Sequence, residues 1–294
     1  MYRTLFFLAL SFFAWFSTTA QEVNSILLRK AETHFDNGEW KEAAAMFNVL
    51  INESPSVLGL YPYAVASNDL GGDRDGVMAA VVLSEKSGIP LDSLFTRTKK
   101  FCTLFGDNGI YERLLLSIKG EQPWFKRIVN RYLLNFYIER KENAKGLGIV
   151  DEALETYPDN PSLLKSKAMI LADLGKLDAA ADCMEKVLLL NPSADDARMF
   201  LGNYCFIKGE EFYDRATGFS GTDVPDSVSV ADSDTADCRS MARNMFMRAS
   251  EYLNPDSNGT VTPYVRNTVN IIRERLEALT DPAPAVPKQT ARPK

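Results

Sequence analysis

The segment Leu164–Pro192 reads LKSKAMILADLGKLDAAADCMEKVLLLNP and holds the pattern that decides the fold. Four of its residues precede Pro192 at offsets of 15, 12, 8 and 5 positions, so steps of three, four and three place them on one helical face. These residues are Leu177, Ala180, Met184 and Val187. The same offsets counted back from Pro55 give Trp40, Ala43, Phe47 and Leu50. Two distant segments therefore predict the same helix, closed each time by a proline.

The closing proline recurs along the chain at intervals of 35, 33, 35 and 34 residues. The five prolines are Pro55, Pro90, Pro123, Pro158 and Pro192. Seventeen positions before three of them stands a glycine suited to a left-handed helix end, namely Gly38, Gly106 and Gly175. Twenty-four positions before three of them stands a small residue where paired helices would approach, namely Ala31, Ala66 and Ala168. Such a period predicts an all-α solenoid of helical hairpins.

At these positions the chain resembles the tetratricopeptide repeat (TPR) family, whose unit is a helix-turn-helix closed by a proline. The best copies are Leu27–Pro55 and Leu164–Pro192; residues 58–90, 91–123 and 126–158 are degenerate, and Asp73 and Lys141 replace the turn glycine in two of them. The resemblance implies a right-handed α-solenoid of about six TPR-like hairpins, because neighbouring repeats bury each other's faces.

The sixth repeat is interrupted. Its closing proline, Pro255, comes 63 residues after Pro192, and the acidic segment 210–237 predicts a disordered insertion. The stretch Thr262–Leu279 has apolar residues at helical spacing and predicts a C-terminal capping helix. We therefore expect one repeat domain over residues 21–280, followed by a disordered proline-rich tail over 281–294.

The first 20 residues have the layout of a secretory signal peptide: Arg3, an apolar run from Leu5 to Phe16, and small residues up to Ala20. The run is shorter than the roughly 20 apolar residues that span a bilayer. We expect an exported protein that begins at Gln21, has no transmembrane segment in its mature form, and resides in the periplasm or on the surface of a Gram-negative bacterium.

Charge is uneven along the chain, whose formal net charge is −6. Residues 97–145 hold 11 Lys and Arg against 5 Asp and Glu, whereas 210–237 hold 8 acidic residues and one Arg. The basic middle could face an acidic partner or the chain's own acidic segment, or both could be solvated surfaces. The acidic balance gives no basis for nucleic-acid binding.

Four cysteines allow disulfides in an exported chain, namely Cys102, Cys183, Cys205 and Cys238. A bridge between Cys205 and Cys238 would tether the insertion. The other interpretation is that cysteines inside predicted helices pack as small apolar residues.

The residues offer little chemistry, so we expect no enzyme, no cofactor and no metal. The only histidine, His34, is expected to pack on the first hairpin. Four aspartates of the insertion could supply oxygen ligands to calcium, but their spacing does not fit a calcium loop, and a solvated loop is the alternative. These are Asp223, Asp226, Asp232 and Asp234.

The resemblance implies that the first helix of each repeat lines a groove for a peptide. Carried over, the ligand-contacting places fall on Arg131, Asn135, Lys165 and Asn203, with Tyr63 on or near the same face. The two cations and the amide groups resemble part of a carboxylate clamp, because they are donors suited to a terminal carboxylate. The alternative is that they are ordinary groove residues.

The sequence thus predicts an exported, non-enzymatic scaffold that binds a protein or peptide in the groove, in envelope assembly or secretion. A second hypothesis is a cell-surface saccharide- or nutrient-binding accessory protein, for which Phe212, Tyr213 and Phe219 of the insertion would be the aromatic platform.

Overall fold

The protein is all-α over the residues that its computed structural model describes, which are 24–218, 232–253 and 262–280. Within these ranges it forms 13 α-helices in a paired antiparallel, TPR-like arrangement and two 3-10 turns, with no strand. The helices divide into two compact units between Glu142 and Asn143. The described helices within the predicted repeat domain over 21–280 thus fall into two units.

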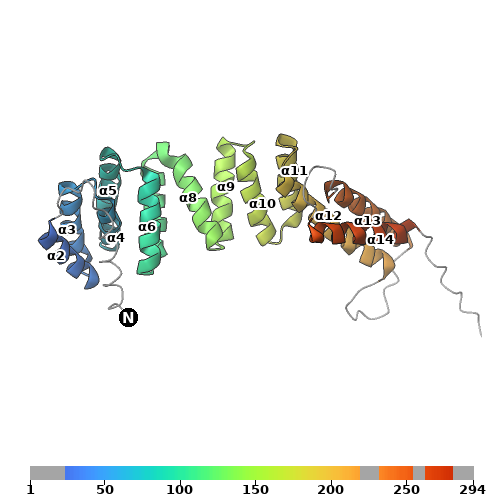
Figure 1. Cartoon of the computed structure of the whole chain (residues 1–294), viewed down its shortest axis with the longest axis horizontal. Helices are drawn as coiled ribbons and strands as arrows, with labels where there is room; N and C mark the ends of the chain where they lie inside the picture. Colours follow the sequence, from blue (N-terminus) through green and yellow to red (C-terminus); the bar gives the residue numbers. More distant parts are fainter. Residues whose placement is uncertain (1–23, 219–231, 254–261, 281–294) are drawn as a thin grey trace, which may run out of the picture. The chain divides into compact units, whose positions relative to one another are not determined.

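Unit 1 holds three consecutive hairpins and one further helix (Figure 1). Each helix packs on its neighbour in the chain, and α4 also packs on α6 and α7. The helices are α2 (Ser25–Asp36), α3 (Trp40–Glu53), α4 (Tyr61–Leu70), α5 (Arg74–Lys86), α6 (Leu91–Phe105), α7 (Asn108–Glu121) and α8 (Lys126–Glu139). The 3-10 turns Leu58–Leu60 and Pro123–Phe125 lead into α4 and α8.

Unit 2 begins with α9 and ends with the predicted cap (Figure 1). Neighbouring helices pack in sequence, with the most extensive contact between α12 and α13, and α14 covers both of these. The helices are α9 (Asn143–Thr156), α10 (Pro161–Asp173), α11 (Leu177–Leu190), α12 (Asp195–Thr217), α13 (Asp232–Leu253) and α14 (Pro263–Thr280).

The periodic prolines lie where the sequence predicts them, just after the second helix of a hairpin. Pro55, Pro158 and Pro192 each follow the last helical residue by two positions, Pro90 caps the start of α6, and Pro123 opens a 3-10 turn. Proline lacks the amide hydrogen and disfavours helix in the preceding residue, so the chain turns there.

The hairpin turns use left-handed residues, as predicted. Gly38, Gly106 and Gly175 have φ angles of 78°, 91° and 73°. Among the described residues only one side-chain-bearing residue has a positive φ, and this is Lys141 at 57°, in the place of a missing turn glycine. In the α4–α5 turn Gly72 adopts the left-handed conformation instead, and Asp73 caps α5 by accepting from the Gly76 amide at 2.9 Å.

The small residues predicted at the crossings of paired helices are fully buried; they are Ala31, Ala66 and Ala168. On the second helices, the predicted apolar faces are also buried, through Ala43, Phe47 and Leu50 and through Ala180, Met184 and Val187. Trp40 and Leu177, which open these helices, are half-buried. In these two hairpins the repeat pattern therefore identifies the packed face of the second helix.

The predicted insertion over 210–237 is wrong at both ends. Glu210–Thr217 continues α12, and Asp232–Asp237 begins α13, whereas residues 219–231 lie outside the described part of the chain. Packing overrides the polar composition here, because Phe212 and Tyr213 pack against the apolar cluster around Phe246. An ion pair of 2.9 Å between Arg275 and Glu210 also joins α14 to the extended α12.

All four cysteines are free, and the candidate Cys205–Cys238 bridge is not formed. Gly202 lies against Leu253 and Gly209 against Phe246, so antiparallel register places Cys205 opposite position 250. That position is 12 residues, or about 18 Å of helix, from Cys238. A disulfide needs Cα atoms within about 7 Å, so the register excludes this bridge.

The predicted capping helix is confirmed as α14. Val265 and Ile272 are buried on it, and Val269 and Leu276 pack half-buried on the same cluster of α12 and α13. The proposed signal peptide, the segment around Asp223 and Asp226, and the tail from 281 to 294 lie outside the described residues.

Replacing Gly209 by alanine tests the crossing of α12 and α13. A Cβ atom there would lie 2.6 Å from the buried ring of Phe246, so the ring or the helices must shift, and we expect the free energy of unfolding to fall by about 1–3 kcal/mol. Gly148→Ala in α9 is the control, since its Cβ meets nothing within 4 Å; helix propensity should then raise the value by about 0.5–1 kcal/mol. Urea unfolding measures the free energy of unfolding of both variants. Equal changes for Gly209→Ala and Gly148→Ala would contradict the close contact between Gly209 and Phe246.

Candidate functional site

The first-helix face of unit 2 combines an ion pair with exposed apolar side chains. Lys165 and Met169 are one turn apart on α10, and Met169 is 56% exposed. The Lys165 ammonium lies 2.6 Å from the Asp196 carboxylate at the start of α12 and lowers its pKa, mainly through their hydrogen bond. The predicted donor Lys165 is thus engaged by a carboxylate of its own chain.

Asn203 continues this face along α12. Its side-chain oxygen accepts a hydrogen bond of 3.3 Å from the hydroxyl of Tyr264, which stands 56% exposed on α14. Met199 precedes Asn203 by one turn and Ile207 follows it by one turn, the latter exposed. The face therefore offers apolar side chains between polar groups that are already hydrogen-bonded.

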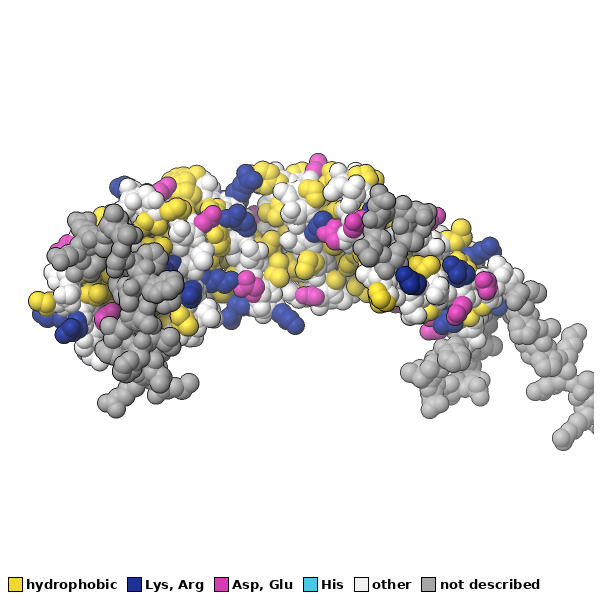
Figure 2. Space-filling view, in the orientation of Figure 1, with side chains coloured by type: hydrophobic (Ala, Val, Ile, Leu, Met, Phe, Trp, Pro, Cys, Tyr) yellow, Lys and Arg dark blue, Asp and Glu magenta, His cyan; other side chains and the backbone are white. Residues whose placement is uncertain are grey.

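The predicted donors of unit 1 lie on α8. A guanidinium nitrogen of Arg131 contacts Asp92 of α6 at 2.9 Å, and the hydroxyl of Tyr132 donates to the same oxygen at 3.0 Å. Asn135 is exposed one turn after Arg131. Figure 2 shows several Lys and Arg side chains over the region of α6 and α8, in agreement with the basic composition of this part of the sequence.

The predicted clamp is split between the two units. Arg131 and Asn135 share one helix of unit 1, whereas Lys165 and Asn203 lie on two helices of unit 2. Each cation is paired with a carboxylate of its own unit. A terminal carboxylate would compete with these carboxylates, so the clamp stays a prediction.

Tyr63 belongs to an aromatic cluster in unit 1. Its ring stacks on Phe47 at 5.1 Å between centroids and meets Phe101 edge-on at 4.7 Å. Burial, together with the nearby carboxylates of Glu32 and Asp36, raises the pKa of Tyr63 to about 12. The ring is half-buried, so part of it remains on the first-helix face.

Glu32 and Asp36 are candidate site residues that sequence reasoning missed. Glu32 is half-buried and Asp36 is exposed, and partial loss of solvent raises the pKa of both carboxyl groups; repulsion from Asp36 raises that of Glu32 further, while Arg29 lowers it by a smaller amount. Their four-residue spacing on the first helix of the first hairpin is the signal that could have found them. The rings beside them come from distant segments, which the sequence does not place.

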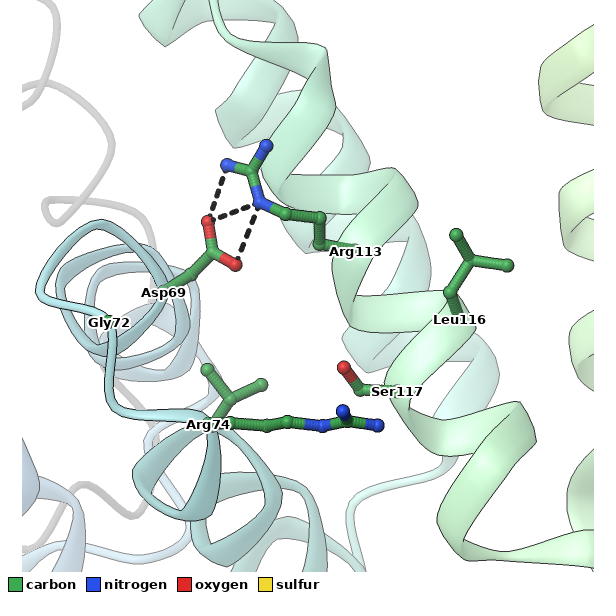
Figure 3. Close-up of a pocket in the computed structure, with 7 residues that line it drawn as sticks. Asp69, Gly72, Arg74, Arg113, Leu116 and Ser117 are labelled. Atoms are coloured by element: carbon green, nitrogen blue, oxygen red, sulfur yellow. Dashed lines mark hydrogen bonds and ion pairs between the residues drawn. The ribbon is translucent and has the colours of Figure 1, made fainter.

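A separate cavity of about 350 Å³ lies between α4, α5 and α7 of unit 1. Figure 3 shows Arg113 reaching across to Asp69, with their shortest contact at 2.6 Å, and Arg74 extending beside Ser117. The Arg74 guanidinium also contacts Glu121 at 2.9 Å. Both arginines are thus neutralised, and the cavity could hold a small polar group only by competing with these ion pairs.

No group of three or more His, Cys, Asp or Glu in the described ranges could hold a metal ion. His34 is half-buried and its Nδ1 pairs with Glu39 in the α2–α3 turn. Among the described helices, none has the length and apolar character that crossing a membrane requires.

Comparison with known proteins finds a match to a helical repeat family over part of the chain. Residues 133–200 match the tetratricopeptide repeat family model. The match runs from within α8 to the start of α12 and includes the Leu164–Pro192 segment. No curated protein sequence matches this chain.

Several solved bacterial structures are similar in part. A putative protein binding protein from Bacteroides ovatus is 17% identical, with 86% of this chain and 98% of that chain covered and a TM-score of 0.40. The C-terminal part of a TPR repeat-containing protein from Cytophaga hutchinsonii is 10% identical, with 86% and 95% covered and a TM-score of 0.39. A tetratricopeptide repeat protein from Parabacteroides merdae is 12% identical, with 84% and 97% covered and a TM-score of 0.35.

Neutralising Glu32 tests the electrostatic cost at the aromatic cluster. The folded-state pKa is raised, so ionised Glu32 destabilises the fold, and this cost appears as the pH rises above the carboxyl's unfolded value. Glu32→Gln should therefore raise the free energy of unfolding at pH 7 and leave it nearly unchanged at pH 3, where both states are protonated. Urea unfolding at the two pH values measures this.

Glu42→Gln, at an exposed position of α3, is the matched control and should change stability little at either pH. A Glu32→Gln variant that is less stable than the unmodified protein at pH 7 would contradict this expectation, because it would show that a counter-charge stabilises the Glu32 carboxylate in the fold.

Proposed function

We propose that this chain is an exported, non-enzymatic scaffold that binds a protein or peptide along the faces of its first helices. The observation that carries the proposal is the face of α10, α12 and α14, where Met169, Ile207 and Tyr264 are exposed between internally satisfied polar groups. The family match over residues 133–200 supports it, because tetratricopeptide repeats generally serve as protein-binding scaffolds.

The chemistry of this face suits a peptide better than a small substrate. Methionine side chains are flexible and polarizable, and they adapt to different apolar partners. A partner can cover Met169 and Tyr264 without removing Lys165 from Asp196, so the ion pair stays satisfied while apolar surface is buried. Burial of exposed apolar surface is the main source of affinity in such contacts.

The alternative of a saccharide-binding accessory protein is less well supported. Two rings of its supposed platform, Phe212 and Tyr213, pack against the cluster of α12, α13 and α14. The Arg275 guanidinium also lies over the Tyr213 ring, at 4.6 Å from its centroid. Rings engaged in this way have little free face for a sugar, and Phe219 lies outside the described residues.

We also propose that the protein is exported to the periplasm or the cell surface of a Gram-negative bacterium, where it serves envelope assembly or secretion. The layout of residues 1–20 as a signal peptide supports this.

A pair of matched substitutions in unit 2 tests the binding face. Met169→Asp places a charge on the first-helix face of α10, whereas Leu189→Asp makes the same chemical change at an 83% exposed position of α11. Because a charge must be desolvated on docking, Met169→Asp should weaken partner binding at least about tenfold, and Leu189→Asp should not. Crosslinking in the native host, followed by mass spectrometry, identifies the partner, and calorimetry with it measures both affinities.

Equal affinities for the two variants, or loss only with Leu189→Asp, would exclude the first-helix face. Melting temperatures of both variants show whether the folds are equally intact.

Export is tested by the amino terminus of the protein made in a Gram-negative host. We expect the envelope fraction to contain a chain that begins at Gln21, because the small residues before it suit signal peptidase. Mass spectrometry of the terminal peptide measures it. A full-length chain that begins at Met1 and stays in the cytoplasm would refute export.

A further inference from the structure

Aromatic rings from α2, α3, α4 and α6 gather around Phe35 in unit 1. Ring centroids lie between 5.2 Å and 6.3 Å from that of Phe35 for five neighbours within the described chain. The neighbours are Trp40, Phe47, Tyr63, Phe101 and Phe105. Phe35 and Phe47 are buried, but the other four rings are half-buried. The cluster therefore presents an apolar aromatic floor to solvent.

Two carboxylates border this floor. Glu32 and Asp36 lie one turn apart on α2, three residues before and one residue after Phe35, and the charges of both raise the pKa of Tyr63. Among residues 24–218, 232–253 and 262–280, no ion pair compensates either carboxylate, and the field of Arg29 offsets only part of the cost at Glu32. They thus differ from Asp92 and Asp196, each of which holds a cation.

Few ligand chemistries satisfy both features. An anion would be repelled by the carboxylates and by the negative faces of the rings. A purely apolar segment would desolvate the carboxylates further without compensating them. A hard metal ion needs more oxygen ligands than two carboxylates among rings supply. A lysine or arginine side chain satisfies both, because its stem packs on the rings while its charged end meets the carboxylates.

We propose that Glu32, Asp36, Tyr63, Phe101 and Phe105, which we call the acidic–aromatic face, dock a lysine- or arginine-bearing segment of a partner protein. The inference rests on the proposed function and adds the chemistry of the partner segment. Charge complementarity is the reason for choosing a cationic segment, because the docked cation supplies the counter-charge that Glu32 and Asp36 lack among the described residues.

Selection from a phage library of random 12-residue peptides tests the face with the full chain as bait. We expect the recovered peptides to be enriched in Lys and Arg next to apolar residues. The best of them, made synthetically, should bind the Glu32→Gln/Asp36→Asn variant at least about tenfold more weakly in a fluorescence titration. Glu42→Gln/Glu53→Gln on α3 changes the net charge equally at exposed positions and should leave binding within about twofold.

A double-mutant cycle makes the test specific to the contact. Replacing the critical Lys or Arg of the peptide by Gln should weaken binding to the unmodified chain, but not to the Glu32→Gln/Asp36→Asn variant. Peptides that bind equally well to that variant and to the unmodified chain would overturn this inference and leave the proposed function standing. Failure to recover any binding peptide would count against both.

Two further outcomes also decide the question. Recovery of peptides without basic enrichment would overturn the assignment of a cationic segment. A chain that begins at Gln21, the form proposed for the exported protein, should bind the selected peptides as the full chain does, and failure of that chain to bind them would likewise overturn the proposal.

Discussion

The close approach of paired helices at small residues is the constraint on which the other contacts depend. Ala31, Ala66 and Ala168 leave no exposed surface, and Gly209 leaves room only for the ring of Phe246. Because each crossing accepts a single packing, the second helix turns a fixed apolar face toward its neighbours. Part of the outward face of the first helices then stays exposed, as at Met169 and Asn135.

The turns show what enforces this arrangement. A left-handed residue reverses the chain within a hairpin, and a proline ends the second helix before it can run on. Lys141 adopts the left-handed conformation without being glycine, which costs about 1 kcal/mol and indicates that the surrounding packing determines the turn. At Gly38 and Gly175 the residue's own preference and the tertiary packing both favour the left-handed conformation. At Lys141 the packing imposes this conformation against the preference of the residue.

Much of the fold follows from the sequence, since Pro192 and Gly175 mark helix ends through backbone chemistry that no partner can alter. The insertion was mispredicted because composition reports solvation but not the packing of Tyr213 on Phe246. The sequence left the Cys205–Cys238 pairing open because helix register decides the distance between the two cysteines, and the α12–α13 crossing sets that register. The candidate residues on the first-helix faces could be named from the repeat, but their partners could not.

The ion pairs on the two units suggest where a partner can gain free energy. Lys165 and Arg131 already hold carboxylates, so a ligand that replaces Asp196 or Asp92 exchanges one pair for another and gains little. Glu32 is in the opposite state: folding has partly removed its water without supplying an equivalent counter-charge. The desolvation cost is thus present before any partner arrives, and an incoming cation gains the full interaction with a preorganised carboxylate. For this reason Glu32, whose ionised form is destabilised by folding, is a better guide to partner binding than Arg131 and Lys165, the donors that resemble a carboxylate clamp.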